Sequence, residues 1–423
     1  MLHKEIILPT FKISSKVPEL VFKLLFLFVT IFSFLGTANF VAKQGLFIGL
    51  SGVLIAIYII LKGKLVINIK LIVTLIFSVS YSVACFLFVR NYFITNLVYN
   101  SMLLLFIEFF ECVNDKTRAF LYLSISYAAG LFVAFVSITT RTYWEQGLTI
   151  YSSSLNSFWD GGIVSRTGLS LLVVSFIAIC FLLIIMKNSF RKIYTIPLFT
   201  FPIFLASTVS IIAGNRSFVV SLFIMFFVML GFKVYTTDNK MTKKIFVISI
   251  VIAILLLIII FLIRLGVIPI PESILKIKLF YRIFVNNSND DRISLYIEFF
   301  EKFYRYPFGG LTNNMKSHYV HNVFLDFYTF GGIISFASST LFFIFLFKAL
   351  YLFVKKTKCQ LNLKAFCVAI IISILSIGLF EPVYQANPNC VVPLFLCYLF
   401  MSYINGEPKM IRNHLVEYCE INI

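Results

Sequence analysis

Apolar runs of membrane-crossing length recur along this chain, separated by short clusters of charged residues. The run Ile245–Ile263 contains Ser249 as its only polar residue and lies between Lys243-Lys244 and Arg264. A helix needs about 20 apolar residues to cross roughly 30 Å of hydrocarbon. Hydrophobic residues make up 60% of the chain and charged residues only 13%, about half the charge of a typical soluble domain. The sequence therefore predicts an all-α, polytopic integral membrane protein and excludes a soluble globular one.

The same test predicts a bundle of about 12 transmembrane helices. Their expected bounds are 19–39, 45–61, 71–89, 95–113, 119–139, 168–186, 194–213, 217–232, 245–263, 322–347, 365–383 and 390–405. Lys and Arg gather in alternate connecting segments, and positively charged short loops stay in the cytoplasm. We therefore expect both termini to be cytoplasmic. No small-residue cleavage site follows the first apolar stretch, so we expect the first span to be retained.

The net charge of +18, from 36 Lys and Arg against 18 Asp and Glu, lies in loops between spans. Nucleic-acid binding needs a basic face that follows phosphates, so we expect no nucleic-acid partner and a lipid bilayer instead. The eight cysteines form no CxxC pair. Neither a disulfide framework nor a metal site is predicted from them.

Two segments on the outside face are too long to be simple connectors within what we interpret as one integral membrane domain, 1–423. They are 140–167 and 264–321. The second contains apolar residues at helical spacing over 294–304, followed by Pro307-Phe-Gly-Gly. This pattern predicts a short amphipathic helix that ends in a turn and lies over the membrane surface.

Charged residues near the outer ends of spans are candidates for chemistry, because charge in lipid is costly. Arg216, in Gly214-Asn-Arg-Ser, opens a span, where it either binds an anion or snorkels to the interface. Asp290-Asp291 is interpreted as a helix cap rather than a Mg²⁺ or Ca²⁺ site. Arg292 either pairs with Glu298 or binds an anionic substrate.

Histidines stand where the second long segment enters the next span, at His318 and His321, with Asn322 beside them and Asp326 about one turn deeper. A histidine is a ready general base near neutral pH, and a neighbouring carboxylate or amide can orient its ring. The alternatives are a hydrated interfacial histidine and a His-x-x-His metal site that lacks a third ligand nearby. In the other long segment, the aromatic residues around Tyr151–Arg166 suit either sugar binding or anchoring at the interface.

Three motifs in order resemble the superfamily of O-antigen polymerases (Wzy) and O-antigen ligases (WaaL). They are Gly214-Asn-Arg-Ser-Phe, then Asp-Arg292-Ile with an aromatic segment to Pro307-Phe-Gly-Gly, then His321-Asn-Val-Phe-Leu-Asp-Phe-x-x-Phe-Gly-Gly332. The resemblance covers about 194–350 and the number of spans. It implies a metal-independent membrane glycosyltransferase without a cofactor. Its substrates would be undecaprenyl-pyrophosphate-linked oligosaccharides at the periplasmic face of a bacterial inner membrane.

The resemblance also implies residue roles. Arg216 and Arg292 match the arginines that hold the pyrophosphate, and His321 matches the histidine that deprotonates the attacking hydroxyl. Fixed guanidinium groups would stabilise the charge that develops on the leaving pyrophosphate. Further contacts to phosphate or sugar are expected from Arg166, Arg282, Asn322 and His318.

Three functions stay open. A polymerase, transferring the glycan to the terminal sugar of another lipid-linked repeat unit, is favoured by analogy because two long outside segments can hold two glycans. A ligase would transfer it to the lipid A core, and a flippase would only move it. Transporters keep ionisable residues within their spans, whereas here these lie toward the span ends: Lys23, Glu108, Glu111, Asp326 and Glu381. A chain-length regulator is the implied protein partner.

Overall fold

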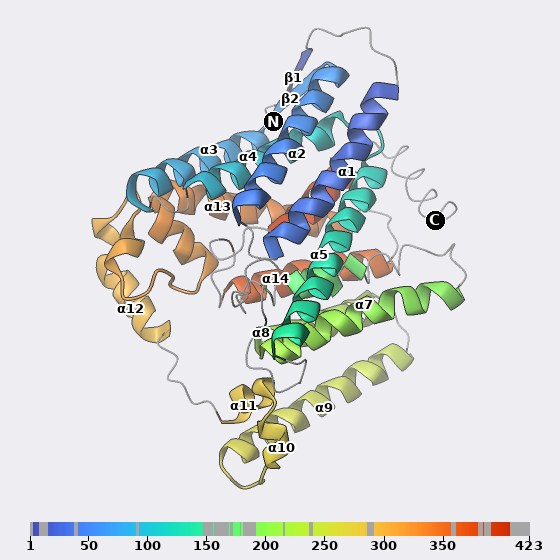
Figure 1. Ribbon diagram of the computed structural model, residues 1–423, viewed down its shortest axis with the longest axis vertical. Helices are drawn as coiled ribbons and strands as arrows, with labels where there is room; N and C mark the ends of the chain where they lie inside the picture. Colours follow the sequence, from blue (N-terminus) through green and yellow to red (C-terminus); the bar gives the residue numbers. More distant parts are fainter. Residues whose placement is uncertain are drawn as a thin grey trace. The chain divides into compact units, whose positions relative to one another are not determined.

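A computed structural model of the protein describes residues 3–7, 16–37, 41–89, 93–146, 155, 169, 172–177, 179–180, 192–214, 216–236, 240–285, 292–356, 361–379, 384 and 391–406. These residues are mostly helical, as the apolar runs predict, with one pair of short strands (Figure 1). The chain divides into two compact units. The first is 1–131, 290–356 and 378–406, and the second is 132–289, 357–377 and 407–423.

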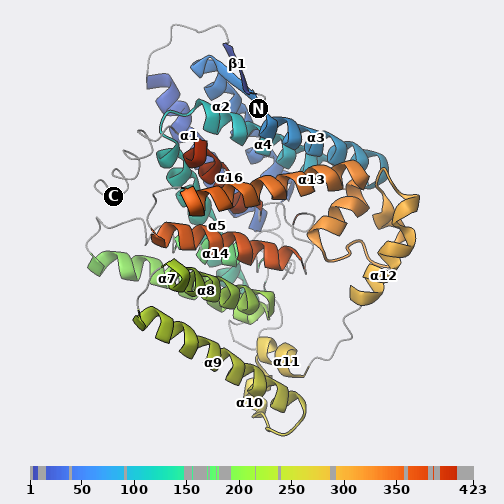
Figure 2. The same ribbon diagram turned by 180° about the vertical axis from the view of Figure 1, so that it is seen from behind.

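The first unit is a bundle around the long helix α13 (Val323–Lys356). Helix α13 packs against α3 (Ile69–Ala84) and α16 (Val391–Gly406), and Figure 2 shows it running along both. On the other side of α3, contacts run from α4 to α2 and then to α1. The bounds of these and the remaining elements are α1 Lys16–Thr37, α2 Val41–Lys62, α4 Phe93–Cys112, the π-helical η1 Cys85–Val89 and α12 Arg292–Lys302.

Two short strands that the sequence analysis did not predict join this unit at one end. Strand β1 (His3–Ile7) pairs antiparallel with β2 (Lys64–Asn68). The amide of Val66 donates to the Glu108 carboxylate at 3.0 Å. Glu111 accepts from the side chain of Asn68 at 3.1 Å. Each of the two glutamates at the end of α4 therefore accepts one hydrogen bond from β2.

Helix α13 is broken at Gly332, where φ is 71° and ψ is −168°. A side chain rarely adopts this left-handed region, so glycine is the residue that allows the break. The break separates a short helix, 323–331, from the segment 333–356. That second segment has roughly 24 residues and is about 36 Å long, enough to cross the hydrocarbon by itself.

The second unit contains α7 (Lys192–Ala213), α8 (Arg216–Thr236) and α9 (Lys240–Arg264). Helix α8 packs on α9, and the short helix α11 (Lys278–Phe284) contacts α7, α8 and α9. The one-turn helix α10 (Glu272–Leu275) packs on α11. Most of α14 (Leu361–Gly378) and the end of α5 (Lys116–Gln146) also belong to this unit.

Five helices in the described part of the chain are long and apolar enough to cross a membrane: Ile69–Val89, Arg118–Glu145, Arg216–Thr236, Lys240–Arg264 and Val323–Lys355. Four shorter apolar helices lie at Ile48–Lys62, Phe201–Ala213, Cys367–Gly378 and Val392–Ile404. A membrane-spanning, all-α architecture is therefore supported, whereas a count of about 12 is not reached by these residues. Only part of the predicted span 168–186 is described.

Two predictions of local structure have clear outcomes. The helix predicted over 294–304 is α12, followed by a 3₁₀ turn, η2 (Phe303–Arg305). The outside segment predicted to begin at 140 is helical as far as Gln146, because α5 continues past its apolar part. The polar residues that end the apolar run, such as Arg141 and Glu145, form an ion pair along the helix and do not terminate it.

Candidate functional site

The Pro307–Gly310 turn packs directly against the break in α13. A Cβ atom at Gly309 would lie 2.4 Å from the carbonyl oxygen of Phe330, and one at Gly332 would lie 2.4 Å from that of Pro307. Such distances are far inside van der Waals contact. The amide of Ile333 donates to the Pro307 carbonyl at 2.8 Å. Two of the three sequence motifs therefore meet backbone to backbone, which requires their glycines.

Asp326 is fully buried and binds the backbone just before α13. One carboxylate oxygen accepts from the amide of Val320 at 2.7 Å, and the other accepts from the amide of Asn322 at 3.2 Å. Between them, His321 has a φ of 63°, the only positive φ at a non-glycine residue in the described part of the chain. Successive amides around a left-handed residue form a concavity for an anion. Here Asp326 fills it.

Asn322 caps the first turn of α13. Its Oδ1 atom accepts from the amides of Phe324 at 3.1 Å and Leu325 at 3.3 Å. Its Nδ2 atom donates to the carbonyl of Leu379 at 3.4 Å. These contacts give the Asn322 side chain a structural role at the helix N-terminus. Its predicted contact with substrate stays a prediction.

The short helix 323–331 is fixed by aromatic packing against α3. The rings of Tyr81 and Tyr384 meet edge to face, with their centroids 5.6 Å apart. Phe327 packs on both rings, at 5.8 Å and 5.1 Å. All three side chains are buried, so packed aromatic rings support the start of α13 just after His321.

The two histidines of the motif have different environments. His321 is half-buried, with its Nδ1 atom buried, and its ring meets Tyr319 edge to face at 6.5 Å. Tyr319 in turn stacks on Phe330. The side chain of His318 is exposed, and its backbone carbonyl accepts from Thr312 at 2.8 Å. Of the two, His321 is the one whose backbone and ring are held in place.

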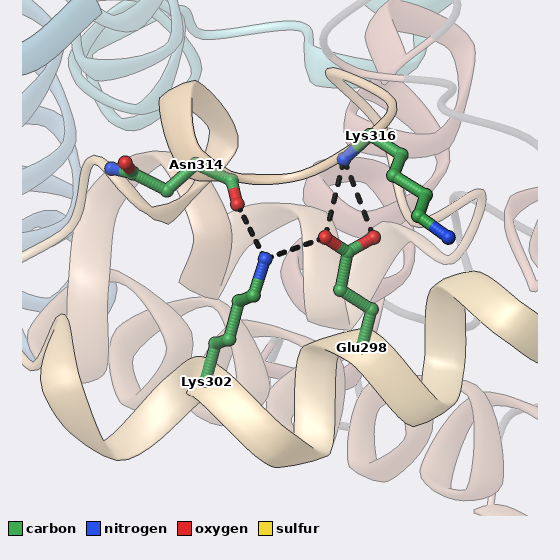
Figure 3. Close-up of polar contacts among 4 residues, drawn as sticks. All are labelled: Glu298, Lys302, Asn314 and Lys316. Atoms are coloured by element: carbon green, nitrogen blue, oxygen red, sulfur yellow. Dashed lines mark hydrogen bonds and ion pairs between the residues drawn. The ribbon is translucent and has the colours of Figure 1, made fainter.

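Glu298 of α12 holds the segment that leads to the histidines (Figure 3). Its carboxylate accepts from Lys302 Nζ at 2.7 Å and from the amide of Lys316 at 3.3 Å. Lys302 Nζ also donates to the carbonyl of Asn314 at 2.8 Å. Burial raises the pKa of Glu298, but the hydrogen bonds and charges of Lys302 and Lys316 outweigh it and lower this pKa below its ordinary value. Glu298, which the sequence suggests as a partner for Arg292, thus forms with Lys302 a clamp on the backbone of Asn314 and Lys316.

Three arginines gather around α11 in the second unit. Nη1 of Arg216 donates to the carbonyl of Arg282 at 3.4 Å, and Nη1 of Arg282 donates to the carbonyl of Gly214 at 2.7 Å. Nε and Nη2 of Arg264 both donate to the carbonyl of Ile283, at 3.0 and 2.8 Å. Arg216 is the first residue of α8, as predicted. This arrangement concentrates positive charge at a helix N-terminus, which suits an anion.

The remaining candidates are less defined. Arg292 is the first residue of α12 and is half-buried. Arg166, Asp290, Asp291 and the aromatic segment from Tyr151 lie outside the described residues. Arg264 was not among the predicted residues, because a basic residue after an apolar run is the usual end of any span. Within the part of the chain that is described, no three His, Cys, Asp or Glu residues gather to hold a metal ion.

The chain was also compared with known proteins. No protein-family model and no curated protein matches it.

Proposed function

We propose that this protein is a metal-independent glycosyltransferase of the bacterial inner membrane that polymerises lipid-linked oligosaccharide repeat units. In this proposal the chain crosses the membrane about 12 times, with both termini in the cytoplasm and the chemistry at the periplasmic face. The donor is an undecaprenyl-pyrophosphate-linked glycan, and the acceptor is the terminal sugar of a second lipid-linked unit.

The observation that carries the proposal is the position of His321. Its backbone is fixed in a left-handed conformation between two amides bound by Asp326, while its ring remains partly exposed. A general base must be held within hydrogen-bonding reach of the proton that it removes. Because Nδ1 is buried, Nε2 is the nitrogen that would take the proton of the acceptor hydroxyl.

The arginines supply the second requirement of this chemistry. The hydroxyl oxygen attacks the anomeric carbon, and the bond from that carbon to the pyrophosphate oxygen breaks. The leaving group, undecaprenyl pyrophosphate, takes the bonding electrons and gains negative charge. Guanidinium groups fixed at Arg216 and Arg282, together with Arg292, would stabilise that charge.

The test combines a gene deletion with analysis of the surface polysaccharide and of the lipid-linked pool. A surface product cut to one repeat unit supports a polymerase. Long chains that accumulate on the lipid carrier, beside an unsubstituted lipid A core, would instead indicate a ligase. Single units trapped at the cytoplasmic face would indicate a flippase and would overturn the proposal of a transferase.

Complementation of the deletion then tests the base. His321→Ala is expected to reach the membrane and to leave the product at one unit. The matched control is Tyr235→Ala, because this aromatic side chain is 88% exposed near the C-terminal end of α8 and none of the proposed site residues lies beside it in the sequence. Normal chains in His321→Ala would remove His321 as the base, and loss in His318→Ala alone would assign the role to His318.

A further inference from the structure

Helix α12 has two apolar faces, and only one of them is covered by the protein. On the covered face, Leu295 and Phe299 are buried, and Phe299 belongs to a core cluster with Leu311, Val320 and Tyr328. The apolar periodicity of the sequence predicts a helix that lies over the membrane surface. In the structure the face with Leu295 and Phe299 holds the 311–320 segment against α13, so a contact with the membrane would use another face of the helix.

A second set of apolar side chains, here called the outer stripe, points away from the protein. Its members are Ile293, Ile297, Phe300, Tyr304 and Phe308, and each of the five is more than half exposed, between 55% and 71%. The first three recur at helical spacing within α12, whereas Tyr304 and Phe308 follow in the 3₁₀ turn and the Pro307–Gly310 turn. Beside the stripe runs an exposed polar edge formed by Ser294, Glu301 and Arg305. The exposed surface is therefore itself amphipathic, with an apolar strip along one side and a polar strip along the other.

The outer ends of two candidate spans locate this helix relative to the membrane. Counting from Lys355-Lys356, a segment of about 20 residues that crosses the hydrocarbon reaches the neighbourhood of the break at Gly332. The Pro307–Gly310 turn touches that break. The same turn contacts Phe88, at the end of the span Ile69–Val89, and Asn313 donates to the Phe88 carbonyl at 2.5 Å. Two spans thus place the turn that follows α12 at the boundary of the hydrocarbon.

We propose that the outer stripe lies in the interfacial layer of the bilayer, with the polar edge toward water. An amphipathic helix at this depth buries its apolar side chains among the acyl chains near the headgroups. The charge beside the stripe fits a lipid surface, because exposed Arg305 donates to the Tyr304 hydroxyl at 3.1 Å and its guanidinium can attract anionic headgroups. A tyrosine and two phenylalanines in the stripe suit the same layer.

The clamp of Glu298 and Lys302 gives this docking a consequence. Since the clamp joins α12 to Asn314 and Lys316, the depth of the helix also sets the depth of the segment that ends at His321. The depth of the helix in the bilayer does not depend on which reaction the protein performs.

Tryptophan scanning of the full-length protein tests the proposal. Trp144 and Trp159 are first replaced by Phe, and a single Trp is then placed at Phe300 or at the adjacent Glu301. Each protein is reconstituted in vesicles of phosphatidylglycerol and phosphatidylcholine whose acyl chains carry bromine near the headgroup. We expect Phe300→Trp to be quenched by the brominated lipid at least about twofold more than Glu301→Trp. Aqueous iodide should quench them in the reverse order.

Other outcomes would overturn the proposal. Equal quenching of both positions by iodide, with none by brominated lipid, would place the stripe in water. Protection of Phe300→Trp from both quenchers would show that protein, such as a second copy of the chain, covers the stripe. The ultraviolet circular dichroism and the elution volume of each variant show whether it is folded. If Phe300→Trp is not folded, Ile297→Trp provides a second position on the outer stripe.

Discussion

Arg216 and Arg282 each hold the backbone of the other's segment. The guanidinium of Arg216 donates to the carbonyl of Arg282, and the guanidinium of Arg282 donates to the carbonyl of Gly214, two residues before Arg216. This reciprocal arrangement joins the N-terminus of α8 to the end of α11. It also means that neither guanidinium is positioned independently, so a change at one arginine displaces the other.

We therefore expect Arg216→Lys to reduce polymer formation at least about tenfold, because lysine keeps the charge but lacks the planar fork that bonds a carbonyl and a phosphate together. The double variant Arg216→Lys/Arg282→Lys should lose little more than the worse single variant, as expected for coupled residues. The measurement is polysaccharide chain length in the complemented deletion strain.

A matched control for the arginines is Arg118→Lys. Arg118 is exposed and pairs with Glu19 at 3.2 Å. Its replacement should leave chain length unchanged, since an exposed ion pair contributes little. Full activity of Arg216→Lys would mean that Arg216 only anchors its helix at the interface, as the alternative interpretation of its sequence position holds.

Asp326→Ala should lower both stability and turnover. The amides of Val320 and Asn322 would lose their acceptor inside the protein, at a cost of roughly 1–3 kcal/mol each, and His321 would leave its left-handed conformation. Asp326→Asn keeps one carbonyl oxygen as an acceptor, so we expect an intermediate effect. Thermal unfolding in detergent measures the stability.

A role for Asp326 in positioning His321 has a separate kinetic signature. In Asp326→Asn, the rate of chain extension should fall while the concentration of lipid-linked donor that gives half the maximal rate stays constant, because the base moves and the phosphate contacts do not. A variant as stable and as active as the native protein would show that the carboxylate is not needed to hold the histidine.

Alanine substitution at three glycines distinguishes the cost of a strained backbone from the cost of a steric clash. Gly49 has open space around its Cβ position, Gly266 has a φ of 74° with open space, and Gly332 has a φ of 71° with backbone atoms within 2.6 Å. We expect Gly49→Ala, inside α2, to stabilise the protein by up to about 1 kcal/mol and Gly266→Ala to cost about 1 kcal/mol. Gly332→Ala should cost clearly more, since both the turn and the helix must shift.

The same thermal unfolding assay measures this glycine series. A Gly332→Ala variant no less stable than Gly266→Ala would mean that the Pro307–Gly310 turn is not held against the break in α13. The contact between Gly309-Gly310 of the turn and Gly331-Gly332 of α13 would then have no part in forming the site.

The helices of this protein follow from simple sequence patterns. Runs such as Ile245–Ile263 predict helices because backbone groups in lipid must bond within the segment. The cap at Asn322 is also predictable, because asparagine is a preferred residue at helix N-termini. Pro307-Phe-Gly-Gly predicts a turn. Each of these features depends on residues that are neighbours in the chain.

Other features depend on partners that are distant in the sequence. His3–Ile7 pairs with Lys64–Asn68, and the amide of Val66 in the second strand donates to Glu108; no local sequence pattern predicts either contact. The carboxylate of Asp326 binds the amides that flank His321, and this contact depends on the left-handed backbone of His321, which the sequence does not predict. The position of Arg264 at the carbonyl of Ile283 likewise appears only once α11 is in place.

The clamp at Glu298 makes the stability of the first unit depend on acidity. Lys302 and Lys316 lower the pKa of Glu298 in the folded protein below its value in the unfolded chain. The unfolded chain therefore binds the proton more readily, and stability is lost as the pH falls through the pKa of the folded state. Above the unfolded value the contribution is complete, so it is constant at neutral pH.

Glu298→Gln is accordingly expected to be less stable than the native protein at neutral pH and to lose less stability on acidification below about pH 4.5. Glutamine still accepts one hydrogen bond but carries no charge for Lys302 Nζ, which lies 2.7 Å from the carboxylate. The exposed Glu301→Gln on the same helix is the control and should follow the native curve. The measurement is the unfolding midpoint between acidic and neutral pH in detergent. Parallel curves for Glu298→Gln and the native protein would show that the clamp contributes nothing to the acid sensitivity of the fold.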